Sequence, residues 1–423
     1  MKLLSRLLLA TLVAFSTGCA TQPQAPAAAP PTAAATRPAP LLLISIDAFR
    51  ADYFDRGLTP TLAMLAQGGV HADAMRPSFP SLTFPNHYTL VTGLYPDHHG
   101  IVNNTMVDPV LGKFTLDNRK AVGDGRWWDS GTPIWEDADA HGLRTATMFW
   151  PGTEAGIHGR HPDYWMPYDG KVTPDQRVDQ VLAWFDLPAD QRPAFVTLYF
   201  DQVDHAGHDH GPHSPEVNQA LRDTDAALAR LMAGLQQRGL FDRTNIIVLA
   251  DHGMASVPLA NTILIEKLIP LDEVQTVNLD IVAGFNPKPG YDFAAIERTL
   301  EQPQQHMRCW DKTRIPARLH YGSNPRVPQL VCLADTGWRI ATAEELAKHA
   351  GHISVGEHGY DNADPRMGAL FIAHGPAFQV GLRYPEFPNV DVYPLMTHLL
   401  GIPAGKNDGD YNQVKGMLKP ADR

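Results

Sequence analysis

Residues 41–47 read Leu-Leu-Leu-Ile-Ser-Ile-Asp. The first six positions carry no charge and five of them are aliphatic, which is typical of a central strand buried on both faces. The run ends at Asp47, and open α/β sheets place their ligand crevice beyond the carboxyl ends of such strands. The stretch therefore predicts an α/β fold with a polar site at one edge of its sheet.

Strands and helices alternate along the rest of the chain. Apolar runs predict further strands at 144–150, 194–200, 245–250 and 369–373, and helices are expected at 173–185, 215–237 and 390–400. A further helix is expected to begin at Pro60, with Thr59 as its N-cap and Gly68-Gly69 as its stop. The alternation favours a mainly parallel central sheet with helices on both faces. The looser pattern at about 255–350 is interpreted as a smaller cap insertion.

The composition is that of a globular protein and limits the classes of partner. The chain has 423 residues, of which 44% are hydrophobic and 19% charged, with a formal net charge of −11. A nonspecific nucleic-acid groove needs clustered Lys and Arg, so no stable nucleic-acid partner is expected. A small anionic substrate remains compatible with this charge, because bound metal ions can invert the local field. The oligomeric state stays open.

The N-terminus has the pattern of an export signal. Lys2 and Arg6 precede an apolar run at 7–15, and small residues follow at 16–20. The run is too short to span a bilayer stably. We therefore interpret residues 1–19 as a signal peptide, with simple cleavage or a lipid anchor at Cys19 as alternatives, and expect a periplasmic protein.

Three segments follow this signal. Residues 20–40 form an Ala- and Pro-rich tether, residues 41–410 the main domain, and residues 411–423 a C-terminal tail. Apart from Cys19, the chain contains Cys309 and Cys332. Two cysteines in an oxidising compartment most simply form one disulfide.

Asp and His residues follow the predicted strands where each strand ends. They are Asp47 after the first strand, Asp204 and His208 after the strand at 194–200, Asp251 and His252 after the strand at 245–250, and His358 in a glycine-flanked segment. Parallel strands bring their carboxyl ends to one edge, so these side chains are expected to meet. Three Asp and three His divide into two mixed nitrogen and oxygen sites suited to Zn²⁺. Two such ions can clamp the attacking and leaving oxygens of a displacement at phosphorus.

Thr83 is the candidate nucleophile for such a displacement. It lies between Pro80 and Pro85, which restrict the backbone around it. An isolated threonine commonly caps a helix or closes a turn, and its hydroxyl is a poor nucleophile without a base or a metal. Coordination to one of the two ions would supply the missing activator.

Several motifs follow one another in order between about residue 40 and residue 400. They include Thr83-Phe84-Pro85-Asn86-His87, Thr92-Gly93-Leu94-Tyr95-Pro96, Trp150-Pro151-Gly152, Asp204 to His208, Asp251-His252-Gly253-Met254, His358-Gly359-Tyr360-Asp361-Asn362 and Asn389-Val390-Asp391-Val392-Tyr393. This order resembles the nucleotide pyrophosphatase/phosphodiesterases of the alkaline phosphatase superfamily. The resemblance implies an alkaline-phosphatase-like three-layer α/β sandwich. The animal relatives' extra terminal domains have no counterpart here, as in simpler bacterial members.

The resemblance also implies roles at the reacting centre. Thr83 would attack phosphorus and form a covalent phospho-threonine intermediate. Two Zn²⁺ ions would be held, one by Asp204, His208 and His358, the other by Asp47, Asp251, His252 and the Thr83 oxygen. His205, His210 and His213 crowd the same segment, but only His208 has the matching spacing.

Four residues match positions that contact the substrate in this family. Asn104 would donate a hydrogen bond to a non-bridging phosphate oxygen. Phe84 and Tyr168 would sandwich the base, with Leu116 near its edge. The expected substrate is therefore a nucleotide, cleaved to a nucleoside monophosphate.

The same residues are compatible with two alternative functions. A lipid or choline phosphodiesterase would use the same metal ligands, since aromatic boxes also hold cations. A degenerate member would be a zinc- or nucleotide-binding surface protein without activity. A monoester phosphatase is disfavoured, because no arginine is placed to clamp a dianion.

Overall fold

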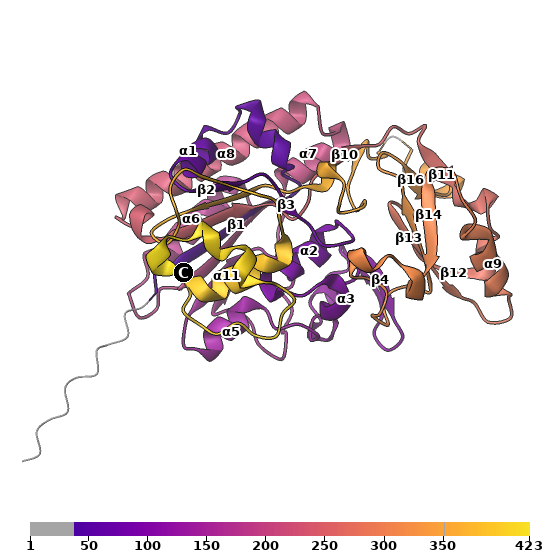
Figure 1. Ribbon diagram of the computed structural model, residues 1–423, viewed down its shortest axis with the longest axis horizontal. Helices are drawn as coiled ribbons and strands as arrows, with labels where there is room; N and C mark the ends of the chain where they lie inside the picture. The colour runs from indigo at the N-terminus through magenta and orange to yellow at the C-terminus, as the bar shows by residue number, and fades with distance from the viewer. Residues whose placement is uncertain (1–37, 351) are drawn as a thin grey trace, which may run out of the picture. The chain divides into compact units, whose positions relative to one another are not determined.

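The strand at 41–46 lies at the centre of an eight-stranded sheet. The protein is described by a computed structural model over residues 38–350 and 352–423 (Figure 1). In order across the sheet, the strands are β19 (Leu382–Tyr384), β2 (Val70–Ala72), β18 (Phe371–His374), β9 (Asn245–Leu249), β1 (Leu41–Ile46), β8 (Phe195–Phe200), β6 (Thr145–Met148) and β7 (Tyr164–Trp165). Every residue of β1 is buried, as its sequence predicts. The predicted signal peptide and most of the predicted tether lie outside the described residues.

Most neighbouring strands of this sheet are parallel. β1 pairs in parallel with β8 and β9, β6 with β7 and β8, and β19 with β2. β18 is antiparallel to both β9 and β2. The prediction of a mainly parallel sheet is confirmed, whereas the direction of β18 could not be predicted because an apolar run does not encode strand direction.

Helices cover both faces of the central sheet. The helices of this part of the chain are α1 (Pro60–Gln67), α2 (Thr83–Thr92), α3 (Pro96–His99), α4 (Arg119–Val122), α5 (Ile134–Ala140), α6 (Pro174–Phe185), α7 (Gln202–His210), α8 (Pro215–Gln237) and α11 (Val392–Leu399). Figure 1 shows α1 and α8 on one side of the sheet and α5 and α11 on the other. The fold is therefore the expected α/β sandwich, and α8 has the predicted bounds.

The N-terminus of α1 is capped from a distant helix. Thr59 occupies the N-cap position, as predicted, but its side chain makes no capping hydrogen bond. Instead, the carboxylate of Asp225 on α8 accepts hydrogen bonds from the backbone N–H groups of Thr61 and Leu62, both at 3.0 Å. A buried carboxylate satisfies the free N–H groups and complements the positive helix end better than one hydroxyl.

Residues of the predicted insertion form a second, smaller sheet beside the central one (Figure 1). Its antiparallel order is β12 (Val274–Asn278), β13 (Val282–Pro287), β15 (Leu330–Ala334) and β14 (Met307–Asp311), accompanied by α9 (Phe293–Leu300) and α10 (Ala343–Lys348). Short strand pairs complete the structure: β10 (Ala255–Ser256) with β17 (Gly356–Glu357), β11 (Thr262–Leu264) with β16 (Arg339–Ala341), β4 (Thr105–Asp108) with β5 (Gly112–Thr115), and β3 (Met75–Arg76) with β20 (Phe387–Pro388).

The disulfide predicted from the cysteine count joins two strands of this smaller sheet. Cys309 on β14 and Cys332 on β15 face each other in register and are bonded. The loop between β14 and β15 is attached to α3, because the Asp97 carboxylate accepts hydrogen bonds from the backbone N–H groups of Gly322 and Asn324 (3.0 and 2.9 Å). The insertion is thereby attached next to the helix that carries Thr83.

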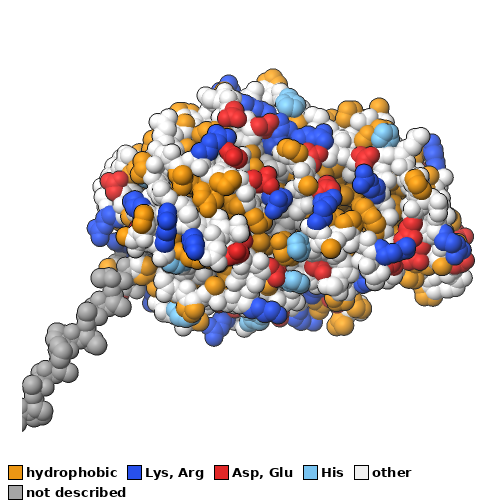
Figure 2. All heavy atoms as spheres, in the orientation of Figure 1, with side chains coloured by type: hydrophobic (Ala, Val, Ile, Leu, Met, Phe, Trp, Pro, Cys, Tyr) orange, Lys and Arg blue, Asp and Glu red, His pale blue; other side chains and the backbone are white. Residues whose placement is uncertain are grey.

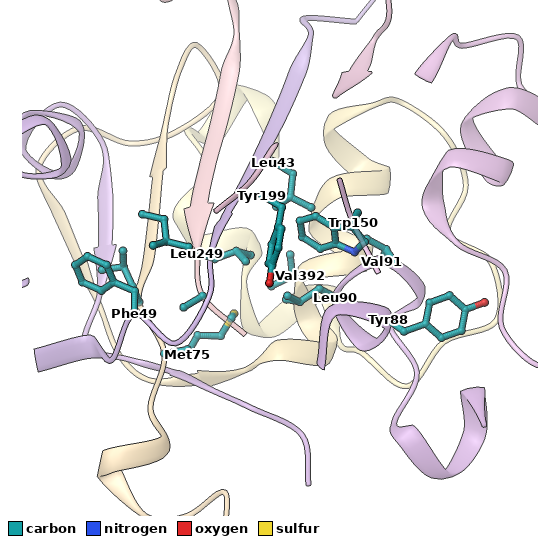
Figure 3. Packing of buried hydrophobic residues seen from close by; sticks show 14 of the residues in the cluster. Leu43, Phe49, Met75, Tyr88, Leu90, Val91, Trp150, Tyr199, Leu249 and Val392 are labelled. Atoms are coloured by element: carbon teal, nitrogen blue, oxygen red, sulfur yellow. The ribbon is translucent and has the colours of Figure 1, made fainter. Parts of the chain in front are cut away.

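The helix that carries Thr83 is almost wholly enclosed. Eight of the ten residues of α2 are buried, and Figure 3 shows its Leu90 and Val91 among core side chains from other elements. The indole N–H of Trp150 donates to the backbone carbonyl of His87 on α2 (3.1 Å). A helix held on nearly all sides gives its first residue a fixed position.

Residues 411–423, expected as a C-terminal tail, fold back onto the domain. Val414, Met417 and Leu418 are fully buried, and the Met417 carbonyl accepts the backbone N–H of Gln379 (2.9 Å).

Within the described residues, no helix is both long and apolar enough to cross a membrane. On the face in Figure 2, Lys and Arg side chains alternate with Asp and Glu.

Candidate active site

The predicted ligands meet at the carboxyl edge of the central sheet. Asp47 directly follows β1, and its backbone N–H donates to the carbonyl of Phe200 at the end of β8 (2.9 Å). Asp251 lies just beyond β9, and its Oδ1 accepts the backbone N–H of Ala48 (3.2 Å). The parallel register of β1 with both neighbours therefore brings these strand ends together.

Asp204, His208 and His358 form one ligand group. Their ligand atoms lie within 4.8 Å of one another. Asp204 and His208 are one turn apart on α7, with Asp204 Oδ1 3.4 Å from His208 Nε2. His358 Nε2 lies 3.6 Å from the same oxygen and 3.2 Å from His208 Nε2. Two imidazole nitrogens and a carboxylate oxygen that converge in this way suit a small cation.

The residues predicted to hold the second ion, Asp47, Asp251 and His252, lie beside the first group and are the second group; the ligand atoms of Asp47, His87 and Asp251 also lie within 4.8 Å of one another. His252 Nε2 lies 3.0 Å from Asp251 Oδ2 and 3.5 Å from Asp47 Oδ1. The ligand atoms of Asp47, Asp204 and His252 also lie within 4.8 Å of one another. The rings of His252 and His358 stack with centroids 3.6 Å apart. The two groups are thus adjacent, as two neighbouring ions would require.

Three carboxylate oxygens in these groups have unfilled acceptor capacity. Asp47 Oδ1, Asp204 Oδ1 and Asp251 Oδ2 are buried and accept no hydrogen bond from any described residue. Burial and the neighbouring carboxylates of Asp251 and Asp204 raise the pKa of Asp47 well above its usual value, because like charges in one buried space repel. A divalent cation would relieve this repulsion, so the residues fit bound Zn²⁺.

Each ligand histidine is oriented by a backbone carbonyl. The Nδ1 atoms contact the carbonyl oxygens of Gly356 (from His208, 2.8 Å), Gly253 (from His252, 3.0 Å) and Ser81 (from His358, 3.0 Å). Because a carbonyl can only accept, each Nδ1 carries a hydrogen and each Nε2 is left to face the cluster. This second layer of hydrogen bonds is what metal-ligating imidazoles require.

The two imidazoles of the first group differ in their proton affinity. Burial lowers the pKa of His358 well below its usual value, and the neighbouring His252 and His208 lower it further. Burial also lowers the pKa of His208, but Asp204 and Glu357 outweigh burial and raise it to about 9. A cation that binds here must therefore displace a proton from His208, which couples binding to pH.

Thr83 is the first residue of α2 and lies beside the second group. Its Oγ1 is 3.2 Å from His252 Nε2. Asn104 Oδ1 accepts the backbone N–H of Phe84 (3.0 Å), which fixes the amide and leaves its amino group with no partner among the described residues. Thr83 and Asn104 line a cavity of about 380 Å³ together with Asp47. A nucleophile and a hydrogen-bond donor thus face one space.

All three residues predicted to contact the base line the same cavity. They are Phe84, Leu116 and Tyr168. The Phe84 ring packs against Trp128, with centroids 5.9 Å apart, and Tyr168 packs edge-on against Phe149 at 5.3 Å. Leu116 is about half exposed. The cavity therefore has a polar end formed by the ligand groups and an aromatic wall.

His87 belongs to the site although sequence reasoning assigned it no role. Its Nδ1 lies 2.9 Å from the Thr83 carbonyl and 3.3 Å from Asp251 Oδ2, and its Nε2 lies 2.9 Å from Ser45 Oγ. The one-turn spacing between Thr83 and His87 was visible in the sequence, but its partners on β1 and after β9 were not. Tyr199 is a similar case: its O–H donates to Asp47 Oδ2 (2.6 Å).

Arg119 and Glu154 also line the cavity and were not predicted. The Arg119 guanidinium donates to Glu154 Oε2, and Glu154 Oε1 accepts the backbone N–H of Tyr168 (2.6 Å). Glu154 lies two residues after the Trp150-Pro151-Gly152 motif, so its position beside that motif could have identified it as a site residue from the sequence. His205 is exposed and lines the same cavity, whereas His210 and His213 are exposed and join no ligand group among the described residues.

Comparisons with known proteins agree with this geometry. A family model described as type I phosphodiesterase/nucleotide pyrophosphatase matches residues 41–361. An uncharacterised pyrophosphatase/phosphodiesterase of Schizosaccharomyces pombe is 38% identical over 381 residues, covering 88% of this chain and 79% of that protein. Ectonucleotide pyrophosphatase/phosphodiesterase family member 1 of Mus musculus is 37% identical, covering 90% of this chain and 43% of that protein. The chain spans less than half of this mouse relative.

Solved structures of the same kind have a very similar fold. Murine ectonucleotide pyrophosphatase/phosphodiesterase 5 superimposes with a TM-score of 0.85 at 33% identity, covering 90% of this chain and all of that chain. A second structure of the murine protein, an inactive threonine-to-alanine variant in complex with AMP, gives the same TM-score.

Proposed function

This chain belongs to the type I phosphodiesterase/nucleotide pyrophosphatase family of the alkaline phosphatase superfamily, and on that premise we propose that it hydrolyses nucleotides to a nucleoside monophosphate. Hydrolysis of phosphodiester bonds is the chemistry that the membership itself supports. One observation carries the more specific proposal. The Thr83 hydroxyl, residues of both ligand groups and the Phe84 and Tyr168 rings line one cavity, whose volume is that of a small-molecule site.

Two Zn²⁺ ions are the proposed cofactor. One would be held by Asp204, His208 and His358, the other by Asp47, Asp251, His252 and the Thr83 oxygen. When bound, the ions would lower the pKa of the Thr83 hydroxyl and neutralise charge at the phosphate. The mixture of imidazole and carboxylate donors supports Zn²⁺ over Mg²⁺ or Ca²⁺, which prefer oxygen ligands alone.

Thr83 is the proposed nucleophile. Its Oγ1 would form a bond to phosphorus as the bond to the leaving group breaks, giving a phospho-threonine intermediate that water then hydrolyses. Its place in the first turn of α2 supports this role, since a helix N-terminus favours negative charge. The inactive AMP-bound variant of the murine relative, in which alanine replaces a threonine, supports it further. The free amino group of Asn104 would donate to a non-bridging oxygen.

A nucleotide base is the proposed occupant of the aromatic wall. Phe84 and Tyr168 would contact its two faces, and Leu116 its edge. A choline head group is less suited, because the Glu154 carboxylate that lines this part of the cavity is already neutralised by Arg119. A cation would meet no unpaired negative charge there.

Export is part of the proposal and rests on sequence alone. Residues 1–19 carry the signal pattern, and a periplasmic location would suit the Cys309–Cys332 disulfide. A lipid anchor at Cys19 is the alternative to simple cleavage. The enzyme would then meet nucleotides outside the cytoplasm.

A turnover panel with metal analysis tests the proposed function. The substrates are ATP, a dinucleotide, a cyclic dinucleotide, glycerophosphocholine and a phosphate monoester. We expect hydrolysis of the nucleotides to a nucleoside monophosphate and about two zinc ions per chain. Preference for the choline ester over every nucleotide would overturn the substrate class. Absence of any turnover by the zinc-loaded protein would favour the non-enzymatic alternative.

A further inference from the structure

Tyr168 is held by one residue that lines the cavity, Glu154, and by one that does not, Asp201. It belongs to the loop between β7 and α6, so no helix or strand fixes its side chain. Its hydroxyl donates to Asp201 Oδ2, and its backbone N–H donates to Glu154. Burial raises the pKa of the Tyr168 hydroxyl, and Asp201 raises it further. The hydroxyl therefore stays protonated and remains a donor.

Asp201 in turn is held by a fully buried arginine. Asp201 directly follows β8 and is 3% exposed, and Arg177 on α6 is 0% exposed. The Arg177 Nη1 lies 3.2 Å from Asp201 Oδ1, and Nη2 donates to Asp201 Oδ2 at 3.3 Å. Removal of either partner would leave an uncompensated charge in the interior, so the pair is strongly held together.

The remaining contacts of Arg177 hold it to the loop before α6 and to β8. Its Nε donates to the carbonyl of Val172 (3.0 Å), and Nη1 donates to the carbonyl of Tyr199 (2.9 Å). Its guanidinium also lies 5.1 Å from the centre of the Phe149 ring, against which Tyr168 packs. Arg177 thus has a single orientation. It holds the Asp201 carboxylate in place, and that carboxylate in turn accepts the hydrogen bond from the Tyr168 hydroxyl.

Neither charged residue lines the cavity. Tyr168 is one of its lining residues, whereas Arg177 and Asp201 are not. The Asp201 carboxylate contacts a lining side chain only through the Tyr168 hydroxyl, whereas Arg177 also contacts the backbone carbonyl of Tyr199, a second lining residue. A ring that is already oriented loses less freedom when a base stacks on it, which strengthens binding without any new contact.

We infer that Arg177 and Asp201 are positioning residues that hold the Tyr168 ring for base stacking and so set the affinity for the nucleoside part of the substrate. They leave the reaction at phosphorus unchanged. The inference rests on the proposed function, because it assigns the aromatic wall to a nucleoside. It goes further by assigning base recognition to two buried residues that never touch the base.

Two substrates that share the same leaving group, p-nitrophenol, test the inference. Thymidine 5′-(p-nitrophenyl phosphate) and methyl p-nitrophenyl phosphate differ only in the nucleoside. For Tyr168→Phe, which keeps the ring and removes the tether, we expect KM for the thymidine ester to rise about 5- to 10-fold, which corresponds to the net contribution of one ordinary hydrogen bond. In Asp201→Asn, whose substituted residue does not line the cavity, we expect kcat for the thymidine ester and both constants for the methyl ester to change less than about twofold.

A matched variant and a double mutant separate positioning from general damage. Tyr164→Phe removes a hydroxyl that donates to the Gln191 carbonyl outside the cavity, and it should change neither substrate's KM. Asp201→Asn should raise KM for the thymidine ester, and the double variant with Tyr168→Phe should be no worse than Tyr168→Phe alone, since Asp201 acts through that hydroxyl.

Three results would overturn the inference. One is an unchanged thymidine KM in Tyr168→Phe, and another is an equal loss on both esters. The third is full additivity of the two substitutions. Failure of the wild-type protein to hydrolyse the thymidine ester, with normal turnover of the methyl ester, would instead overturn the proposed nucleotide function and this inference with it.

Discussion

The polar end and the aromatic wall of the cavity are built in different ways. At the polar end, Asp47 and Asp251 lie just beyond the ends of β1 and β9, whose parallel register fixes their mutual positions, and the next helix, α7, carries Asp204 and His208. The aromatic wall depends on Tyr168, a loop residue held by side chains of Asp201 and Glu154. The first region is a consequence of the fold, whereas the second depends on individual hydrogen bonds. The two regions should therefore respond differently to substitution.

The largest effect is expected at the nucleophile. Thr83→Ala should lower kcat on every substrate by at least about 10³-fold, because removal of a nucleophile abolishes the covalent route. Stopped assays on a nucleotide and on methyl p-nitrophenyl phosphate measure this loss. Thr83→Ser, which keeps a hydroxyl, is the control and should retain far more activity. Full hydrolysis by Thr83→Ala would remove Thr83 from the mechanism.

Metal removal should destabilise the polar end and abolish turnover. The carboxylates of Asp251 and Asp204 would then act on Asp47 without a metal ion to offset their charge. Ligand binding at 1,000 times Kd stabilises a protein by about 4 kcal/mol, so Tm should fall on chelation and recover on addition of Zn²⁺. Calorimetry of both forms measures this difference. An identical Tm with and without zinc would mean that these residues hold no structural or catalytic ion.

A smaller effect is expected at His87, which contacts both Asp251 and the Thr83 carbonyl. His87→Gln should weaken zinc binding by about 10- to 100-fold, as is typical for partners of metal ligands. A competition titration against a chelator measures the affinity. Turnover of the nucleotide and of the base-free ester should fall together, in contrast to Tyr168→Phe.

His99→Gln is the matched control for this prediction. His99 is also fully buried and also contacts α2, through Thr89 Oγ1 (3.0 Å), but it touches no metal ligand. Its substitution should lower stability without changing the zinc affinity. Equal loss of zinc affinity in both variants would show that His87 acts through the fold alone.

The smallest effect concerns a lone buried carboxylate outside both regions. Burial raises the pKa of Asp391 to about 6, and its Oδ2 has no hydrogen-bond partner among the described residues. The folded state thus binds this proton more tightly than the unfolded chain, so its contribution favours folding at low pH and is lost as the pH rises through about 6. At each pH, the free energy of unfolding of Asp391→Asn is compared with that of wild type. This difference should be about 1–2 kcal/mol more favourable to the variant at pH 8 than at pH 4.5.

Urea unfolding of both proteins at the two pH values measures this change. Asp391 has no imidazoles converging on it, unlike the oxygens of the polar end, so zinc should not alter the result. The same difference in stability at both pH values would contradict the raised pKa.

Local sequence patterns pointed to the polar end, whereas the residues of the aromatic wall came only from the resemblance to a known family. A buried strand that ends in Asp47 can be recognised locally, and the parallel sheet then determines where its end lies. Local patterns also predicted α8 with its exact bounds. The cap of α1 by Asp225 and the contacts of His87 were missed, because they join elements far apart in the chain.

The aromatic wall shows the same limit more clearly. The resemblance to a known family pointed to Phe84, Leu116 and Tyr168, and all three line the cavity. It gave no sign that Arg177, a helix residue with an ordinary amphipathic neighbourhood, is buried and paired with Asp201. Side-chain networks of this kind depend on packing, which no pattern of residue types encodes.

The most direct test of the proposed mechanism is capture of the covalent intermediate. The zinc-loaded enzyme would be mixed with ATP, quenched in acid within milliseconds, digested and examined by mass spectrometry. The mechanism predicts a nucleoside monophosphate adduct on Thr83, and its absence in Thr83→Ala. Steady turnover with no adduct on Thr83, or with an adduct on another residue, would contradict it.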